Sequence, residues 1–187
     1  ETHQHNLVDR VRGVDQRLLM PNSNGAEDTT CTHGWFDSLD SDGWSMTYAG
    51  GGWNVNTDTE DYVGWAWKKS ATAGFDIVAY TGNGVARTIS HSLGVVPDLI
   101  IIKGRDVVED WLVGSVQQGL GTGRMYLSTN AATSGSYAAS LWNSTAATAS
   151  VFSVGDSSVV NTNTKLYIAY LFANIDGFSK ISSYKGN

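Results

Sequence analysis

The sequence predicts an all-β protein built from tandem β-sandwich modules of jelly-roll type, related by an internal repeat of about 105 residues. The first observation behind this prediction is that residues 55–67 and residues 160–172 read almost alike. The second is the composition, with 21 glycines, 2 prolines and 16% charged residues, against roughly 25% in ordinary soluble domains. The third is the spacing of turn signals, which recur about every 8–12 residues between short apolar runs, as in sandwiches.

The repeat extends along the whole chain and keeps its order. VNTDTEDYVGWAW at residues 55–67 and VNTNTKLYIAYLF at residues 160–172 share Val, Asn, two Thr and Tyr in register. Further matches recur at nearly the same spacing: Leu7-Val8 with Leu112-Val113, Arg17–Met20 with Arg124–Leu127, Trp44–Met46 with Phe152–Val154, Gly74-Phe75 with Gly177-Phe178, and Tyr80–Asn83 with Tyr184–Asn187. Shifts of a few residues are what surface turns tolerate. We therefore interpret residues 1–83 as a first β module and residues 84–187 as a second, complete module.

The first module lacks a counterpart of residues 84–105, which contain an aliphatic strand introduced by Pro97. A repeat without this core strand is incomplete, and the sequence begins at Glu1 rather than at Met. We expect the chain to belong to a longer protein that has a His-x-Leu-Gly-x-x-Pro-like stretch upstream.

Helix signals are weak, and most of the chain reads as short strands between turns. Residues 7–20 read as strand and loop, because their counterpart contains several glycines that each cost about 1 kcal/mol inside a helix. The Asn83-Gly84 pair predicts a hairpin. Strands are predicted at Phe75–Tyr80, Leu99–Lys103, Arg124–Ser128, Val151–Val154 and Leu166–Phe172. Both faces of the last strand are apolar, which predicts a central strand covered on each side.

Composition also limits the partners that the protein can have. The net charge is −6 and Lys and Arg form no cluster, so the sequence offers nothing that would bind a nucleic-acid backbone. It contains no run of about 18 apolar residues, so we expect no membrane insertion. Cys31 is the single cysteine, which excludes an intrachain disulfide. No motif for a cofactor occurs, and we expect none to be bound.

Few titratable residues are placed to do chemistry. Asp37, Asp40 and Asp42 are weak candidates for a metal site, but their spacing differs from that of an EF-hand loop and the second module has no matching carboxylates. A solvated turn is the favoured interpretation. His91 lies between two serines, whose side chains point away from it on an extended backbone, so no catalytic triad is predicted. We therefore expect a protein that is not an enzyme.

The repeat divides the tryptophans into two groups. Trp44, Trp65 and Trp67 each match an aromatic residue of the second module, so the sequence predicts that they belong to a shared core. Trp53 matches Ser158. Trp35 and Phe36 both lie near the position that matches Trp142, so one of these two aromatic residues has no counterpart in the second module. Trp35 and Trp53 are therefore candidates for contact with a ligand or partner, although packing under a loop is the favoured interpretation.

Several stretches of the chain resemble the repeat modules of tail-fibre and other virion structural proteins of bacteriophages, particularly marine ones. These stretches are GFDIVAYTGNG, ISHSLGVVPDLIIIKGR and VFSVGDSSVVNTNTKLYIAYLFANIDGFSKISSYKGN. Nearly the whole chain fits the pattern in two copies. The resemblance implies a non-enzymatic structural protein on the virion surface, in a tail fibre or another appendage. It further implies that the partners are copies of itself, other virion proteins and host-surface glycan.

Two other functions remain as alternatives. A lectin-like carbohydrate-binding module would use Trp35, Trp53 or nearby turns. A glycan-degrading enzyme, which we rank last, would need two carboxylates at roughly 5 Å or 6.5–9.5 Å. The closely spaced carboxylates that could supply such a pair are Asp37, Asp40, Asp42, Glu60 and Asp61.

Overall fold

The computed structural model describes residues 4–15, 17–31, 34–48, 55–121, 123–132 and 137–186. Strands predominate among these residues and the helices are short, so the described chain is all-β, as the sequence predicts. The strands are β1 (Trp35–Leu39), β2 (Trp44–Thr47), β3 (Phe75–Thr81), β4 (Arg87–Ser90), β5 (Leu99–Gly104), β6 (Leu112–Ser115), β7 (Met125–Tyr126), β8 (Val151–Val154) and β9 (Leu166–Phe172). The helical segments are the 3-10 turn η1 (Val116–Gln118) and the helices α1 (Ala138–Trp142) and α2 (Ser158–Asn161).

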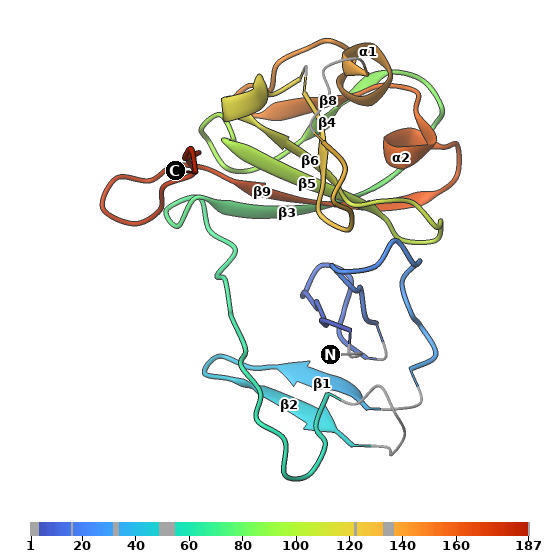
Figure 1. The fold of residues 1–187 in the computed structure, drawn as a ribbon, viewed down its shortest axis with the longest axis vertical. Coiled ribbons are helices and arrows are strands. Elements are labelled where there is room, and N and C mark those ends of the chain that lie inside the picture. The colour runs from blue at the N-terminus through green and yellow to red at the C-terminus, as the bar shows by residue number, and fades with distance from the viewer. Residues whose placement is uncertain are drawn as a thin grey trace.

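The strands form one large and two small antiparallel sheets. The large sheet has five strands in the order β3-β9-β5-β6-β7, while β4 pairs with β8 and β1 pairs with β2. Figure 1 shows the five-stranded sheet and the β4–β8 pair together in one body, with the β1–β2 hairpin at the far end of the molecule. β9 is central, because β3 pairs with one of its edges and β5 with the other.

Most strand predictions are confirmed. β8 and β9 have the predicted bounds, and β3 and β5 each extend one residue further. The prediction of a central strand is also confirmed. Tyr167, Ala169 and Leu171 of β9 pack into one buried cluster, and Ile168, Tyr170 and Phe172 pack into another cluster on the opposite face of the sheet.

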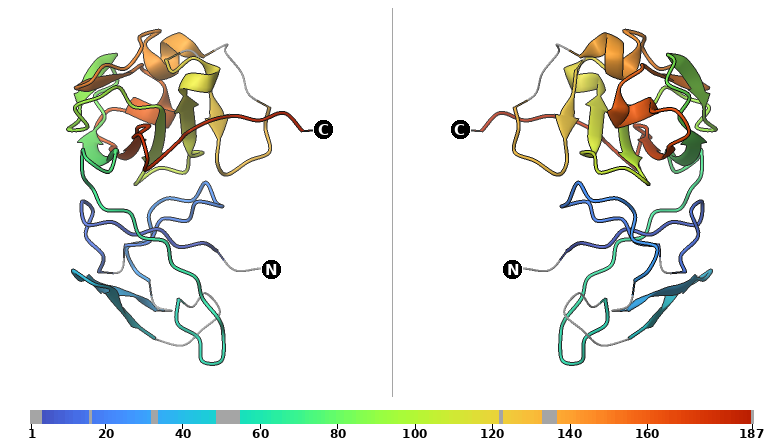
Figure 2. Two further views of the ribbon diagram at one scale, coloured as in Figure 1. Left: turned by 90° about the vertical axis from the view of Figure 1, so that its left-hand side faces the viewer. Right: turned by 90° about the vertical axis from the view of Figure 1, so that its right-hand side faces the viewer.

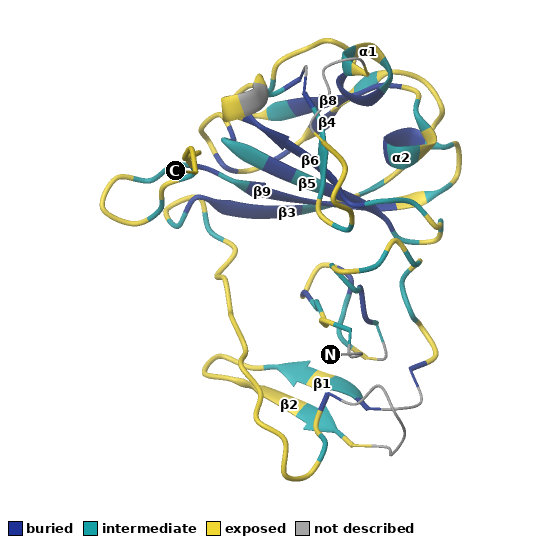
Figure 3. Ribbon diagram, in the orientation of Figure 1, coloured by how far each residue is buried: buried dark blue, intermediate teal, exposed yellow. Residues whose placement is uncertain are grey.

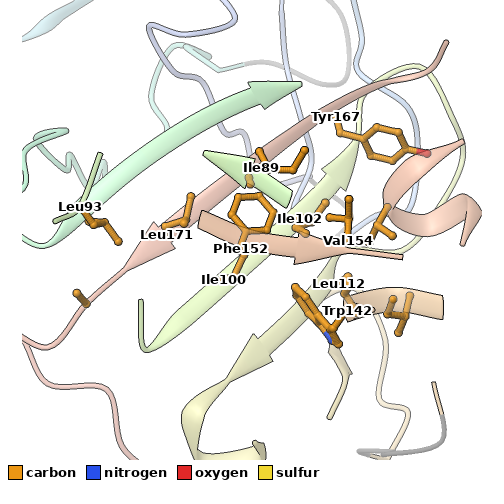
Figure 4. Close-up of a cluster of buried hydrophobic side chains, with 14 residues drawn as sticks. Ile89, Leu93, Ile100, Ile102, Leu112, Trp142, Phe152, Val154, Tyr167 and Leu171 are labelled. Carbon is orange, nitrogen blue, oxygen red and sulfur yellow. The ribbon is translucent and has the colours of Figure 1, made fainter. Parts of the chain in front are cut away.

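The β4–β8 pair and the two helices cover one face of the five-stranded sheet. Figure 4 shows this cluster, in which Phe152 of β8 lies among side chains that include Ile100 of β5 and Leu171 of β9. Trp142 of α1 is buried in the same cluster, and its Nε1 donates a hydrogen bond to the carbonyl oxygen of Gly123 at 3.0 Å. The indole therefore has both an apolar environment and a partner for its polar atom.

The hairpin predicted at Asn83-Gly84 is wrong. β3 before it pairs with β9, whereas β4 after it pairs with β8, so the chain crosses here from one sheet to the other. The backbone N–H of Asn83 donates to the side-chain oxygen of Asn161 at 3.0 Å, and Gly84 N–H donates to the Asn161 carbonyl at 2.8 Å. Bonds to the end of α2 replace the strand-to-strand bonds that a hairpin would make.

β3 connects the two predicted modules. It lies within residues 1–83, yet each of its seven residues pairs with β9 in the middle of residues 84–187. The described structure therefore places the end of the first predicted module in the main sheet of the second. The division at residue 83 stays a prediction from the sequence.

The N-terminal segment, residues 4–15 and 17–31, covers the other face of the five-stranded sheet. Leu19 is buried in one cluster with Trp111 and Tyr170. The rings of Trp111 and Tyr170 are stacked with 6.4 Å between their centroids. Trp111 Nε1 donates to the carbonyl oxygens of Met20 and Ser23 at 3.1 and 3.0 Å. Apolar contacts and hydrogen bonds together fix the segment on the sheet.

A buried network of charges also holds the N-terminal segment in place. Arg12 donates to Glu27 Oε1 at 2.7 Å and to Asp9 Oδ2 at 2.6 Å. Arg105, which follows β5, donates to Glu27 Oε2 at 2.8 and 3.0 Å. The Tyr170 hydroxyl donates to Asp9 at 2.8 Å. Each charge in this network faces an opposite charge, which offsets the cost of removing it from water.

Lys103 of β5 is fully buried beneath the same segment. Its ammonium donates to the carbonyl oxygens of Asn24, Val107 and Glu109 at 3.2, 3.4 and 2.8 Å. Burial lowers the pKa of Lys103 from 10.5 to about 8, while the charges of Glu109 and Asp110 oppose this shift. The protonation of Lys103 is therefore coupled to folding.

Because of this coupling, the stability of the protein should rise between about pH 8 and about pH 10. Over this range the unfolded chain keeps a proton on Lys103 that the folded chain has lost, so raising the pH favours the folded state. We expect the urea midpoint of the wild type to rise with pH and that of Lys103→Met to stay flatter. At higher pH the trend reverses, because burial raises the pKa of Tyr80 and of Tyr170 well above the ordinary value. Parallel pH profiles for the two proteins would contradict this assignment.

Candidate functional site

Residues 60–69, the aromatic segment, expose large apolar side chains to solvent. Val63, Trp65 and Trp67 are 74%, 76% and 62% exposed. Residues 60–69 take part in no strand or bridge of the described structure. Figure 3 shows them within the long exposed stretch that runs from the β1–β2 hairpin towards β3. Such a surface on a chain with few charges is suited to contact with a partner.

The β1–β2 hairpin lies against one side of the aromatic segment. A Cβ atom on Gly64 would lie 2.7 Å from Cη2 and Cζ2 of Trp44, so the indole packs directly on the Gly64 backbone. The ring centroids of Trp44 and Phe36 are 6.5 Å apart, and Trp44 remains 41% exposed. The glycine allows this close approach, and the aromatic surface therefore continues from the segment onto the hairpin.

The turn before the aromatic segment has the same geometry as the turn before β9. The backbone N–H of Thr57 donates to the hydroxyl of Tyr62 at 3.0 Å, and Thr162 donates to Tyr167 in the same way at 2.9 Å. The threonine between them has a left-handed backbone in both turns, with φ of 69° at Thr59 and 66° at Thr164. Threonine rarely adopts positive φ, so two instances at matched positions reflect a shared local structure.

A second equivalence occurs earlier in the chain. Leu7 forms an antiparallel bridge with Leu19, and Leu112 of β6 pairs with Tyr126 of β7. These two pairs occupy matched positions of the sequence repeat. One isolated bridge of the first half therefore has a counterpart in the β6–β7 pairing of the second half.

The prediction that Trp44, Trp65 and Trp67 belong to a shared core is wrong. β9 is buried because β3 and β5 pair with its edges and other segments cover its faces. β5 comes from residues 84–105, which have no counterpart in the first half of this sequence. β2, which matches β8, pairs with β1 instead of with a counterpart of β4. Among the described residues no strand pairs with the matched segment, and its large side chains are exposed.

The two tryptophans predicted to contact a ligand have different outcomes. Trp35 is the first residue of β1, opposite Thr47, and is half-buried. Trp53 lies outside the described residues. The exposed tryptophans of the aromatic segment were not among the predicted candidates, because their counterparts are core residues.

The three aspartates considered for a metal site belong to the β1–β2 hairpin. Asp37 of β1 accepts a hydrogen bond from Thr47 Oγ1 at 2.8 Å, and Asp40 accepts one from Ser38 Oγ at 3.0 Å. Asp40 and Asp42 lie in the exposed turn between the strands. Within the described ranges, no group of three or more His, Cys, Asp or Glu side chains is placed to hold a metal ion.

His91 and Asp76 are buried near the start of β3, where backbone groups hold them. His91 Nε2 lies 3.1 Å from the carbonyl oxygen of Thr148, and Nδ1 accepts from the N–H of Leu93 at 3.3 Å. Burial lowers the pKa of His91. Burial raises the pKa of Asp76, but the hydrogen bonds from Lys69 and from backbone N–H groups outweigh it and leave the pKa below its ordinary value. Both side chains hold the local structure together.

A second exposed segment, residues 178–185, lies near the C-terminus. Phe178 and Tyr184 are 71% and 95% exposed. By the sequence repeat, these residues match the two ends of β3, Phe75 and Tyr80. Residues 174–180 line a shallow hollow at the start of this segment. The described chain therefore exposes one segment that matches β9 and another that matches the partner strand of β9.

Comparisons with known proteins place the chain in a family. None of the described helices is long and apolar enough to cross a membrane. No curated protein and no solved structure matches the chain. A family model matches residues 1–187. The chain therefore belongs to the family described as a domain of unknown function, DUF7483.

Proposed function

We propose that the chain is a non-enzymatic structural protein of a bacteriophage particle, located in a tail fibre or another surface appendage. In this proposal it consists of tandem jelly-roll-like sandwich modules with a repeat of about 105 residues. The modules assemble with copies of themselves or with other virion proteins and contact the host surface. The sequence resemblance to virion repeat modules supports this function by analogy.

One observation carries the proposal: two segments of similar pattern follow turns that share a hydrogen bond and a left-handed threonine, and one lies inside a sheet while the other lies outside. Tyr167 begins the buried part of β9, whereas Tyr62 leads into the exposed aromatic segment. A segment that matches an interior strand, and that exposes large apolar side chains outside any described sheet, is suited to contact with further units. Appendage proteins act through such assembly and through surface contact.

A lectin-like module is the second candidate function. Trp65 and Trp67 present their rings to solvent, and Trp44 extends the same surface. Indole rings combine a large apolar face with a polar edge, which suits them to stacking on sugar rings. This surface could bind host glycan in a free lectin or within an appendage.

The protein content of purified virions tests the proposal. Quantitative mass spectrometry of particles of the phage that encodes the chain should recover its peptides in many copies per particle. Antibodies against the chain should label an appendage in electron micrographs, whereas preimmune serum should not. Recovery of the protein only as a free, saccharide-binding species outside the particles would reject the structural role and favour the lectin.

A further inference from the structure

We propose that residues 178–185 of one chain pair as a β-strand with the aromatic segment of a second copy, which produces head-to-tail assembly. This inference rests on the proposed assembling function and names both the surface and the partner. The mode is β-strand addition, in which a segment of one molecule completes a sheet of another.

The aromatic segment has the features of an acceptor strand. Its sequence matches β9, a strand that the fold pairs on both edges. The turn that begins it already has the geometry found before β9, so the backbone enters the segment in the same way. Its large side chains are exposed and its backbone forms no ladder among the described residues. Pairing would satisfy backbone groups and cover apolar surface at the same time.

Residues 178–185 have the features of the donor. They match β3, which pairs with β9 along its full length. The match includes the aromatic residues at the two ends of β3. Within the chain, Phe75 lies 4.7 Å from Phe172 and Tyr80 lies 5.3 Å from Tyr167, as measured between ring centroids. An equivalent pairing between chains would reproduce these contacts with residues that are now exposed.

The β3–β9 register predicts which residues meet between the chains. Phe75↔Phe172, Tyr80↔Tyr167 and Thr81↔Leu166 are paired within the chain. Carried over to the matched positions, these pairs become Phe178 with Trp67, Tyr184 with Tyr62 and Lys185 with Asp61. The donor has one residue more than β3 between its two aromatic residues, which a β-bulge at Ser182-Ser183 would absorb.

Charge favours pairing at one end of these segments. Residues 178–185 contain Lys180 and Lys185 and no acidic residue, whereas the aromatic segment begins with Glu60 and Asp61 and ends with Lys68 and Lys69. The Lys185–Asp61 pair takes the place of an uncharged pair within the chain, Thr81 with Leu166. Opposite charges directly across two strands stabilise a pairing and like charges oppose it. The charged pair would therefore direct the C-terminal segment to the aromatic segment.

A second copy is a better source of the donor than the same chain. Figure 2 shows the C-terminus extending from the upper body away from the region between the hairpin and β3. In each copy the donor and the acceptor are different surfaces, so the contact is heterologous. Heterologous contacts build a ring when the rotation closes and an open filament when it does not. An appendage made of repeated units fits either outcome.

The test measures self-association of the full chain by light scattering over a wide range of concentration. We expect wild-type association to weaken about tenfold in Lys185→Asp and in Asp61→Lys, and to recover in the double variant, in which the charges are exchanged. Lys165→Asp is the matched control, because Lys165 is a partly exposed lysine outside both segments. A peptide of residues 174–187 should bind the chain and shift its tryptophan fluorescence to shorter wavelength.

Each contrary outcome overturns a defined part of the inference. A wild type that stays monomeric and binds no peptide would reject strand addition. A monomer whose tryptophan emission shifts to longer wavelength when residues 178–187 are deleted would show that the donor folds back on its own chain. A monomeric chain that is still abundant in virions would reject this contact and leave the proposed function standing. A self-associating chain that is absent from virions would reject the function and leave the contact standing.

Discussion

Replacing Glu27 with alanine should lower the free energy of unfolding by about 3–5 kcal/mol, the range expected when one partner of a buried ion pair is removed. The Glu27 carboxylate is almost fully buried and accepts hydrogen bonds from Arg12 and Arg105. Its removal leaves Arg12 with Asp9 alone and takes from Arg105 its carboxylate partner, at a site from which water is largely excluded. Urea unfolding, monitored by fluorescence and circular dichroism, measures the loss.

Lys165→Ala is the control for this prediction. Lys165 Nζ lies 3.7 Å from Asp106 Oδ2, and both side chains of this ion pair are substantially exposed. Exposed pairs contribute about 0–1 kcal/mol, so this variant should unfold close to the wild type. Glu27→Ala should also make residues 4–31 sensitive to proteolysis at low urea, because the network attaches them to the sheet. Equal stability losses in the two variants would show that the buried network does not hold the segment.

Replacing Trp142 with alanine should also cost about 3–5 kcal/mol, the range for a buried Trp-to-Ala change. Trp142 is almost completely buried between α1 and the five-stranded sheet. Its indole lies so close to Gly114 of β6 that a Cβ atom there would be 2.6 Å from Cζ2. The substitution leaves a cavity that this rigid environment cannot fill, and it removes the hydrogen bond to Gly123.

Trp65→Ala gives the matched comparison, because the residue type and the change in volume are the same. Trp65 is exposed, so its replacement should change the unfolding free energy by no more than about 0.5 kcal/mol in dilute protein. Differential scanning calorimetry at low concentration separates the two variants. A large loss in Trp65→Ala would mean that the aromatic segment is packed in solution, contrary to its exposure in the fold.

The strands were predictable from the sequence where local chemistry alone decides the structure. Val151–Val154 and Leu166–Phe172 are runs of β-branched and aromatic residues between turns, and the structure has strands with these bounds. The pairing of strands was not predictable in the same way. Asn83-Gly84 has the composition of a hairpin turn, but β3 and β4 pair with strands from distant parts of the chain. Turn residues limit the local backbone, and distant contacts decide which strand lies alongside.

The candidate site shows even more clearly that distant contacts cannot be predicted from the local sequence. Trp65 and Trp67 match core residues of β9, and the local turn before them is indeed alike in the two halves. Their exposure depends on which strands are present beside them, and a sequence match carries no such information. The signal in the sequence is that residues 84–105, which supply β5, have no counterpart in the first half, so a segment that matches β9 there lacks this partner.

β9 is an interior strand of the sheet, paired on both edges, and also its last strand along the chain. Phe75 of β3 pairs with Phe172, 97 positions later, so the sheet depends on contacts between residues far apart in sequence. Folds dominated by such contacts form slowly, because a long loop must close before pairing stabilises it. During synthesis, β3 and β5 emerge from the ribosome well before β9 and have no central partner. The aliphatic run of β5 is then exposed in the nascent chain, where it favours aggregation until residue 172 emerges.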